Sequence, residues 1–408
     1  MCELPTDVIV DILSRLPVKP LLKFRCVSKP WCALIDSPIF IKSHLNRSIE
    51  TKTNRSIICR DCDLYSIDFD SLDHAILLDH PLKKIHGGEV MGSCDGLVGL
   101  CNNLYEEDGI FLWNPATRKH QKLPVTPIEF PGGSGICEFI VYGFGYDSVS
   151  DDYKLVRVVQ FYEKDDDDSF DNEVKVYSLK SNTWRRVQDF PYYLPYKREH
   201  AMVVSGALHW LVSRRPESDK ADKFIAAFDL GVEEYRLVPL PELLDKNVHM
   251  NVNDFGGCLT LLCNYFAVRV EVWVMEEYGV KESWTKLFSV TQPSMIRSFD
   301  YVRPLDYSRS GGEILLEQDG NILVWYDLER KTVKNVGIHG LDGLIESYIC
   351  VASLVPLRGR GGDGEMDGKK DQLQMKKKMN RKMRGVQTGT LSKWKNKGAE
   401  VWGIRIID

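Results

Sequence analysis

The sequence lacks the long apolar run that a membrane-spanning helix requires. Such a span needs about 18 consecutive apolar residues, and the most apolar segments, 259–270 and 349–357, are shorter and predict buried strands. The first residues contain no basic segment followed by an apolar stretch and a small-residue cleavage site, which are the marks of a secretory signal. We therefore expect a protein of the cytoplasm, the nucleus or both, with no membrane partner.

A disulfide framework is also missing. The eleven cysteines are an odd number and are scattered without regular spacing, and a reducing compartment would leave them as thiols. Cys59 and Cys62 form one C-x-x-C pair, but no second Cys or His pair follows at the spacing of a four-ligand zinc site. The sequence therefore predicts no disulfides, no metal site and no other cofactor.

Motifs of the common catalytic classes are absent as well. The chain contains no H-E-x-x-H, no G-x-S-x-G and no P-loop. Gly143 and Gly145 precede a predicted strand, whereas a phosphate-binding loop leads into a helix, and the adjacent aspartates of 165–168 lack the alternate spacing of a calcium loop. His209 lies inside an apolar run, which favours a packed strand residue over a ligand. We predict no catalytic residues.

The charges are distributed unevenly along the chain. Residues 358–397 carry thirteen Lys or Arg against four Asp or Glu, although the whole chain has a net charge of −5, so the part before this segment is acidic. An acidic body argues against nucleic-acid binding by the folded part, because phosphates require a basic face, so any such contact would come from the tail. The composition of 358–408 predicts a disordered basic tail, which serves as a nuclear-localisation signal, is only a solvated segment, or was introduced by an imprecise gene model.

Residues 1–45 predict a module of three short helices. Thr6 is expected to cap the first helix, Pro17 to end it, a second helix to cover 19–25, and Ser28 to cap a third. A module this small buries little of its surface, and its surplus of apolar side chains indicates an interface. The alternative is an ordinary helical subdomain packed against the rest of the chain. The apolar residues at helical spacing in the first helix are Val8, Ile9, Ile12, Leu13 and Leu16.

The long second part, 90–357, predicts strands throughout. Runs rich in β-branched and aromatic residues alternate with Gly, Asn, Asp and Pro turns, and long amphipathic helices are missing. A loose repeat is visible, in which an apolar strand is followed by a polar turn and by a strand that closes on Leu-Pro or Phe-Pro, as at 110–124 and 174–191. A spacing of about 45 to 65 residues suits four-stranded blades. We therefore predict a β-propeller.

The order and spacing of several N-terminal motifs resemble the plant F-box. These motifs are Leu4-Pro5, the segments 12–19 and 22–29, and Trp31 with Ile35. The resemblance implies that this module binds a Skp-type adaptor and, through it, a cullin and a RING subunit. The adaptor-binding residues that it implies, in or directly beneath the interface, are Leu4, Pro5, Ile9, Ile12, Leu13, Leu16, Leu21, Arg25, Val27, Trp31 and Ile35.

The second part is similar to the plant F-box-associated domain, although it lacks regularly spaced kelch double glycines. The similarity rests on 92–98, 113–117, 142–147, 152–154 and 206–210. It implies a mainly β chain with a small α module: a three-helix F-box over 1–45, a connecting segment with the first strands over 46–89, a propeller-like domain over 90–357, and the tail. Relatives include regulators of immune-receptor turnover and pollen self-incompatibility factors, and the sequence does not decide between these roles.

The expected function is that of the substrate-recognition subunit of an SCF-type (Skp–cullin–F-box) ubiquitin ligase, which recruits a target protein for ubiquitination and degradation. The target-contacting residues are expected on loops such as 131–135, 161–172 and 214–222, since loops vary without disturbing the blades. Two alternatives stay open: a glycan-binding or sugar-processing propeller with a helical cap, and an F-box protein that works outside the ligase.

Overall fold

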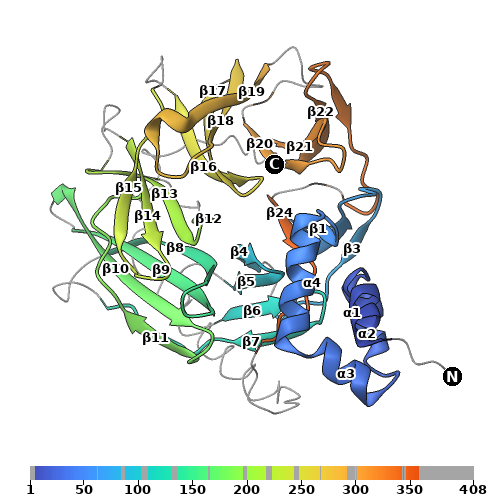
Figure 1. The fold of residues 1–408 in the computed structure, drawn as a ribbon. Helices are drawn as coiled ribbons and strands as arrows, with labels where there is room; N and C mark the ends of the chain where they lie inside the picture. Colours follow the sequence, from blue (N-terminus) through green and yellow to red (C-terminus); the bar gives the residue numbers. More distant parts are fainter. Residues whose placement is uncertain are drawn as a thin grey trace, which may run out of the picture. The chain divides into compact units, whose positions relative to one another are not determined.

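The computed structural model describes residues 5–61, 63–83, 88–102, 109–129, 136–163, 166–195, 200–216, 223–242, 248–266, 268–291, 299, 301–341, 343 and 346–357. Within these ranges a small helical module precedes a large array of β-sheets (Figure 1). None of the helices in the described part is long and apolar enough to cross a membrane.

The helical module has four helices, one more than the sequence predicted. The fourth helix was missed because its buried face mixes Phe40 and Leu45 with His44 and Ser48, which weakens the apolar periodicity. Its start is nevertheless marked by Ser37, whose Oγ accepts a hydrogen bond from the Phe40 amide at 3.3 Å. The helices are α1 (Thr6–Ser14), α2 (Val18–Phe24), α3 (Lys29–Ile35) and α4 (Pro38–Glu50).

The predicted helix starts are partly correct. Ser28 caps α3 as expected, with its Oγ accepting from the Trp31 amide at 3.3 Å. Thr6 does not cap α1; it is the first helical residue, and Pro5 stands at the cap position without a side-chain bond. Proline is common at such helix starts because the first amides of a helix have no partner within it.

The strands form six four-stranded antiparallel sheets in the described part of the chain, which are the blades of a β-propeller (Figure 1). Blade 1 contains β24 (Glu346–Val351), β1 (Arg55–Arg60), β2 (Leu64–Asp68) and β3 (Ala75–Leu77). Blade 2 contains β4 (Glu89–Cys94), β5 (Leu97–Cys101), β6 (Ile110–Asn114) and β7 (Lys119–Lys122), and blade 3 contains β8 (Ile136–Asp147), β9 (Asp152–Glu163), β10 (Asp166–Ser178) and β11 (Thr183–Arg186).

The remaining three blades follow in chain order. Blade 4 contains β12 (Met202–Val204), β13 (Ala207–Ser213), β14 (Lys223–Asp229) and β15 (Tyr235–Val238). Blade 5 contains β16 (His249–Phe255), β17 (Cys258–Tyr265), β18 (Arg269–Met275) and β19 (Trp284–Thr291), and blade 6 contains β20 (Val302–Tyr307), β21 (Glu313–Gln318), β22 (Ile322–Asp327) and β23 (Val333–Asn335).

The ring is closed by pairing between the two ends of the propeller sequence. Strand β24 pairs antiparallel with β1, from Arg55 opposite Val351 to Arg60 opposite Glu346. The strands expected within the connecting segment 46–89 therefore belong to the propeller itself, where β1, β2 and β3 supply three strands of blade 1. Sequence patterns did not show this pairing, because it joins residues nearly the whole domain apart.

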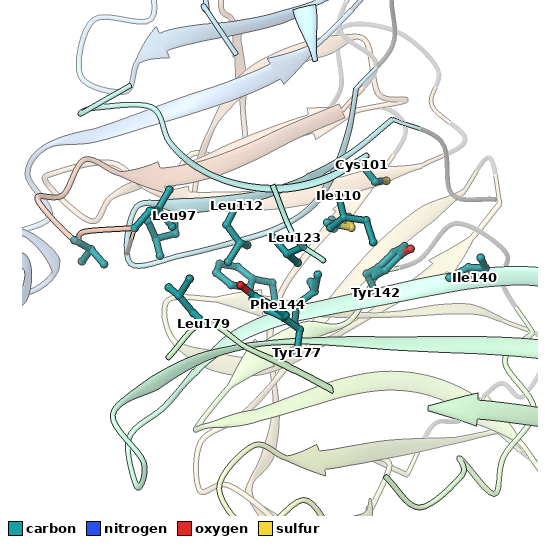
Figure 2. Packing of buried hydrophobic residues seen from close by; sticks show 14 of the residues in the cluster. Leu97, Cys101, Ile110, Leu112, Leu123, Ile140, Tyr142, Phe144, Tyr177 and Leu179 are labelled. Atoms are coloured by element: carbon teal, nitrogen blue, oxygen red, sulfur yellow. The ribbon is translucent and has the colours of Figure 1, made fainter. Parts of the chain in front are cut away.

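Adjacent blades pack through their apolar faces. Between blades 2 and 3, buried residues such as Leu112, Leu123, Tyr142 and Phe144 form one cluster (Figure 2). Gly143, in β8 of blade 3, faces blade 4, and a Cβ atom there would lie 2.6 Å from Leu208 Cδ1. The Gly-x-Gly segment is therefore a place of close blade contact inside a strand, consistent with its failure as a phosphate-binding loop.

The close approach at Gly143 predicts that Gly143→Ala destabilises the propeller. The added methyl group would also lie 2.8 Å from Ala201 Cβ, and such overpacking costs about 1–3 kcal/mol. Chemical denaturation measures the free energy of unfolding. Gly337→Ala is the matched control, since no described atom lies within 4 Å of the Cβ position there. Equal stability of the two variants would contradict the packing argument.

Candidate adaptor-binding and target-binding surfaces

The helical module has a closed core of its own. Leu13, Leu21 and Ile35 are exposed by no more than 1% and pack together with Val18 and Phe40. Three residues of the implied adaptor set therefore lie beneath the surface and support the helices from inside. Truncating them would test the fold of the module as much as its binding.

The outer surface of the module carries several apolar side chains. Ile12 and Val27 of the implied set are 48% and 62% exposed, and Pro5 is exposed as well. Val8, which is 42% exposed, lies one helical turn before Ile12, so the two side chains share one face of α1. This exposed pair is the clearest candidate for an adaptor contact.

The other implied residues are half-buried or paired. Ile9, Leu16 and Trp31 are partly covered by the module's own core. Arg25 donates a hydrogen bond from Nη2 to Asp36 Oδ2 at 2.7 Å, and this bond raises the pKa of the guanidinium. Leu4 lies outside the described residues. The structure thus divides the implied adaptor residues into exposed side chains and side chains that support the helices from inside. The sequence could not make this division.

A short segment after β24 joins the helical module to the propeller. We call residues 352–357 the C-terminal strap. Its Leu354 belongs to the core of the helical module, whereas Val355 and Leu357 belong to the core between blades 2 and 3, together with Leu45 of α4. Apolar contacts on both sides therefore fix the helices to the propeller.

Asn114, at the end of β6, holds the strap in place. Its Nδ2 donates to the carbonyls of Ser353 at 3.2 Å and Val355 at 3.0 Å, while its Oδ1 accepts from the amides of Ala116 and Thr117. The side chain is fully buried, so all these groups are shielded from water. In the sequence Asn114 stands out only as part of the family motif 113–117, which does not reveal this role.

The two ends of the propeller differ in their connections. Short turns such as Asp95–Gly96 and Gly256–Gly257 follow the innermost strands, and the strap begins at this end, where Ser353 Oγ donates to the Asp95 carbonyl at 2.6 Å. We call this the turn end. We call the opposite end of the propeller the loop end. There Arg60 lies beside the first residues of two innermost strands, Glu346 of β24 at 3.3 Å and Glu89 of β4 at 4.0 Å.

The loops expected to contact a target connect strands at the loop end. Residues 131–135 precede β8, and 214–222 join β13 to β14. The first segment and 217–222 lie outside the described residues. The predicted loop 161–172 is instead largely strand, since Phe161 and Gln160 of β9 pair with Asp171 and Asn172 of β10. Pairing with a neighbouring strand overrides the turn-like composition there.

The residues weighed for chemistry do not form a site among the described residues. Burial raises the pKa of the Cys59 thiol to about 12, which keeps it protonated and unreactive, and Cys62 lies outside the described residues. Asp165 also lies outside them. No group of three or more His, Cys, Asp or Glu in the described part could hold a metal ion.

His209 is buried in blade 4, where it contacts the next blade. Its Nε2 lies 2.6 Å from the Tyr278 hydroxyl, and its Nδ1 lies 3.3 Å from the Met202 carbonyl. Burial lowers the pKa of this imidazole to about 4, so the ring is neutral at physiological pH. These contacts agree with the prediction of a packed strand residue.

Buried charges in the propeller are arranged as structural pairs. Arg157 and Glu173 are almost fully buried and bond at 2.7 Å, and Arg157 also donates to the Thr126 carbonyl at 3.0 Å. Lys175 lies 3.8 Å from the same Glu173. Such pairs satisfy one another and hold the chain before β8 against blade 3, so they do not mark a reaction site.

The fold and these surfaces define a class of protein: a closed six-bladed propeller that carries a helical interaction module at one end. Two family models match the chain, an F-box domain over residues 1–43 and an F-box associated beta propeller domain over 55–353. The chain belongs to the family of F-box proteins with an F-box-associated propeller. The F-box domain implies binding to a Skp-type adaptor, and members are typically non-catalytic subunits of ubiquitin ligases.

Curated relatives cover both modules. F-box protein CPR1 of Arabidopsis thaliana is 41% identical over 372 residues, which are 87% of this chain and 89% of that protein. F-box protein At4g22390 of the same plant is 37% identical over 395 residues, 93% of this chain and 97% of the relative. Among solved structures, a fucoside complex of Aleuria aurantia lectin aligns with 71% of this chain and 96% of the lectin at 10% identity and a TM-score of 0.40, too distant to support an inference.

The clamp at Asn114 predicts that Asn114→Ala loosens the strap. Buried carbonyls and amides would lose their partners, at a cost of about 1–3 kcal/mol for each unsatisfied group that water cannot reach. Hydrogen exchange over 352–357 and over α4 should become faster than in the wild type. Asn46→Ala, on the exposed face of α4, is the control. Unchanged exchange in Asn114→Ala would show that the apolar contacts alone hold the strap.

The buried imidazole of His209 predicts acid-sensitive stability. Its folded pKa of about 4 lies below the value of about 6.5 in an unfolded chain, so the unfolded state binds more protons between these values. The stabilising contribution of the neutral His209 is fully present above pH 6.5 and is lost as the pH falls toward 4. Over this range the free energy of unfolding decreases by up to about 1.4 kcal/mol per pH unit. His209→Gln cannot titrate, so its free energy of unfolding should vary less with pH in this range. If the free energy of unfolding varies with pH equally in the wild type and in His209→Gln, the lowered pKa of His209 is contradicted.

Proposed function

We propose that this protein is the substrate receptor of an SCF-type ubiquitin ligase. The exposed face of α1 around Val8 and Ile12 would bind the Skp-type adaptor, which connects the receptor to a cullin and a RING subunit. The loop end of the propeller would hold a target protein for ubiquitination and proteasomal degradation. The receptor would act in the cytoplasm, the nucleus or both.

The single observation that carries this proposal is that exposed apolar face. The module's core is already closed by its own helices and by Leu354 of the strap, yet Val8 and Ile12 remain 42% and 48% exposed. Apolar side chains at the centre of an interface supply most of its affinity. The family assignment implies the kind of partner, and the exposure of Val8 and Ile12 supports this face of α1 as its place on the module.

The receptor contributes no reacting group in this proposal. Ubiquitin transfer would be performed by the conjugating enzyme, and the receptor would raise the local concentration of target lysines near it. The strap supports this role, because a helical module that is fixed to the propeller by apolar contacts and by Asn114 presents the adaptor and the target in one constant arrangement. No cofactor is required for such a task.

The adaptor-binding face predicts that Ile12→Lys abolishes capture of the adaptor. Ile12 is half-exposed, so the change leaves the module's core intact while it places a charge in the interface. Loss of a central contact costs about 2–4 kcal/mol, which corresponds to a decrease in affinity of at least about 30-fold. Isothermal titration calorimetry with a purified Skp-type adaptor measures this affinity.

Leu237→Lys is the matched control, since Leu237 is 40% exposed on β15 of the propeller. Leu237→Lys should bind the adaptor like the wild type. If Ile12→Lys also binds the adaptor like the wild type, the adaptor does not use this face of α1. If the wild type captures the adaptor but never the cullin, the protein is an interaction subunit outside the ligase and the proposed function is wrong.

A further inference from the structure

Two histidines from distant parts of the chain lie side by side at the outer edge of blade 1. His74 directly precedes β3, the outermost strand, and His339 lies in the connection that leads from β23 of blade 6 to the closing strand β24. The two residues form a parallel β-bridge. The Ala75 amide donates to the His339 carbonyl at 2.9 Å, and the His339 amide donates to the Asp73 carbonyl at 2.8 Å. Their backbones are therefore held at a fixed separation.

The two imidazole rings are spaced as a pair of metal ligands would be. Their centres are 5.5 Å apart, and their planes are inclined by 45°. Zinc binds an imidazole nitrogen at about 2.0–2.1 Å, so two rings that share one ion have centres about 5 Å apart. The observed spacing is close to this value, and a small rotation of either side chain would bring both rings to one ion.

The surroundings of His74 prepare one ring nitrogen for a metal ion. Asp73 Oδ2 lies 3.2 Å from Nδ1 of His74, and Ser71 Oγ donates to Asp73 Oδ1 at 2.7 Å. A carboxylate beside Nδ1 favours a proton on that nitrogen, which leaves the lone pair of Nε2 free for a ligand bond. Such a carboxylate is the usual companion of a metal-binding histidine.

The fold does not use these two rings for packing. The side chain of His74 is 68% exposed, and His339 is exposed as well. No described group forms a hydrogen bond with the ring nitrogens of His339. His209 is different, because it is buried and its two ring nitrogens lie near the Tyr278 hydroxyl and the Met202 carbonyl. The nitrogens of the exposed pair are therefore accessible to an ion from solution.

We propose that His74 and His339 form a site for a divalent transition-metal ion such as Zn²⁺ or Ni²⁺. Nε2 of His74 and one ring nitrogen of His339 would bind the ion, and water molecules would complete its coordination. Imidazole suits these ions, whereas Mg²⁺ and Ca²⁺ prefer oxygen ligands. The site has two protein ligands, fewer than the groups of three or more that are absent from the described residues, so the ion would exchange with the solvent.

A bound ion would act as a clasp on the closed propeller. His339 belongs to the connection that carries the chain into β24, and His74 belongs to the blade that the pairing of β24 with β1 completes. The two histidines come together only in the closed ring, so an ion that they share binds the folded state and stabilises it. This role goes beyond the binding of an adaptor and a target, and it does not depend on either.

Isothermal titration calorimetry of the full chain with NiCl2 counts the bound ions, in a buffer whose non-thiol reductant keeps the cysteines reduced. We expect His74→Ala and His339→Ala each to bind one ion fewer than the wild type, and the double variant to lose no more than either single variant. His120→Ala is the matched control, since His120 is an exposed histidine of β7 whose described ring contact is Phe111. His120→Ala should retain the ion that the other two variants lose.

Thermal unfolding provides a second measurement. Saturating NiCl2 should raise the midpoint temperature of the wild type by at least about 2 °C more than that of His74→Ala or His339→Ala. MgCl2 should give no such difference, and with EDTA all the proteins should unfold at nearly the same temperature, because the two rings are exposed. His74→Gln and His339→Gln replace the alanine variants if either of these is unstable.

Three results would overturn the proposal. The first is an equal number of bound ions in the wild type and both histidine variants. The second is the loss of an ion in only one of these two variants, which would mean that the rings do not share it. The third is the same loss in His120→Ala, which would mean that any exposed histidine of the propeller binds the ion.

Discussion

The pairing of β24 with β1 is the constraint on which the rest of the structure depends. This ladder joins residues near the start of the propeller to residues near its end, and it completes the blade between blades 2 and 6. The entropy cost of closing a long loop grows only slowly with its length, so one strand pair and the apolar faces on either side can close the whole ring. Without it, blade 1 would lack its innermost strand.

Closure also decides where the helical module sits. The strap continues directly from β24, and it enters the module's core through Leu354 and the core between blades 2 and 3 through Val355 and Leu357. The same chain end that closes the propeller therefore fixes the helices to its turn end. The longer connections between strands lie at the opposite end, so the proposed function would allow one chain to bind an adaptor and a target at once.

Local chemistry explains why parts of the fold could be predicted. The apolar stripe of α1, the cap at Ser28 and the turn-separated apolar strands depend on neighbouring residues, which sequence patterns report directly. Helix α4 escaped prediction because His44 and Ser48 lie on its buried face. The strand character of 161–163 and 166–172 escaped prediction because pairing with the neighbouring strand outweighed composition. The implied adaptor residues were found as a set by family resemblance, yet that set mixed core with surface.

By itself, the sequence determined the class of the protein: a small α-helical F-box before a mainly β propeller of the F-box-associated family, with no recognisable catalytic motif. Only the tertiary structure decided that Leu13 supports the module while Ile12 faces outward, and that Asn114 clamps the strap. The physical reason is that motifs and periodicity follow from residues a few positions apart, whereas burial and shared surfaces depend on contacts between segments that are distant in the chain.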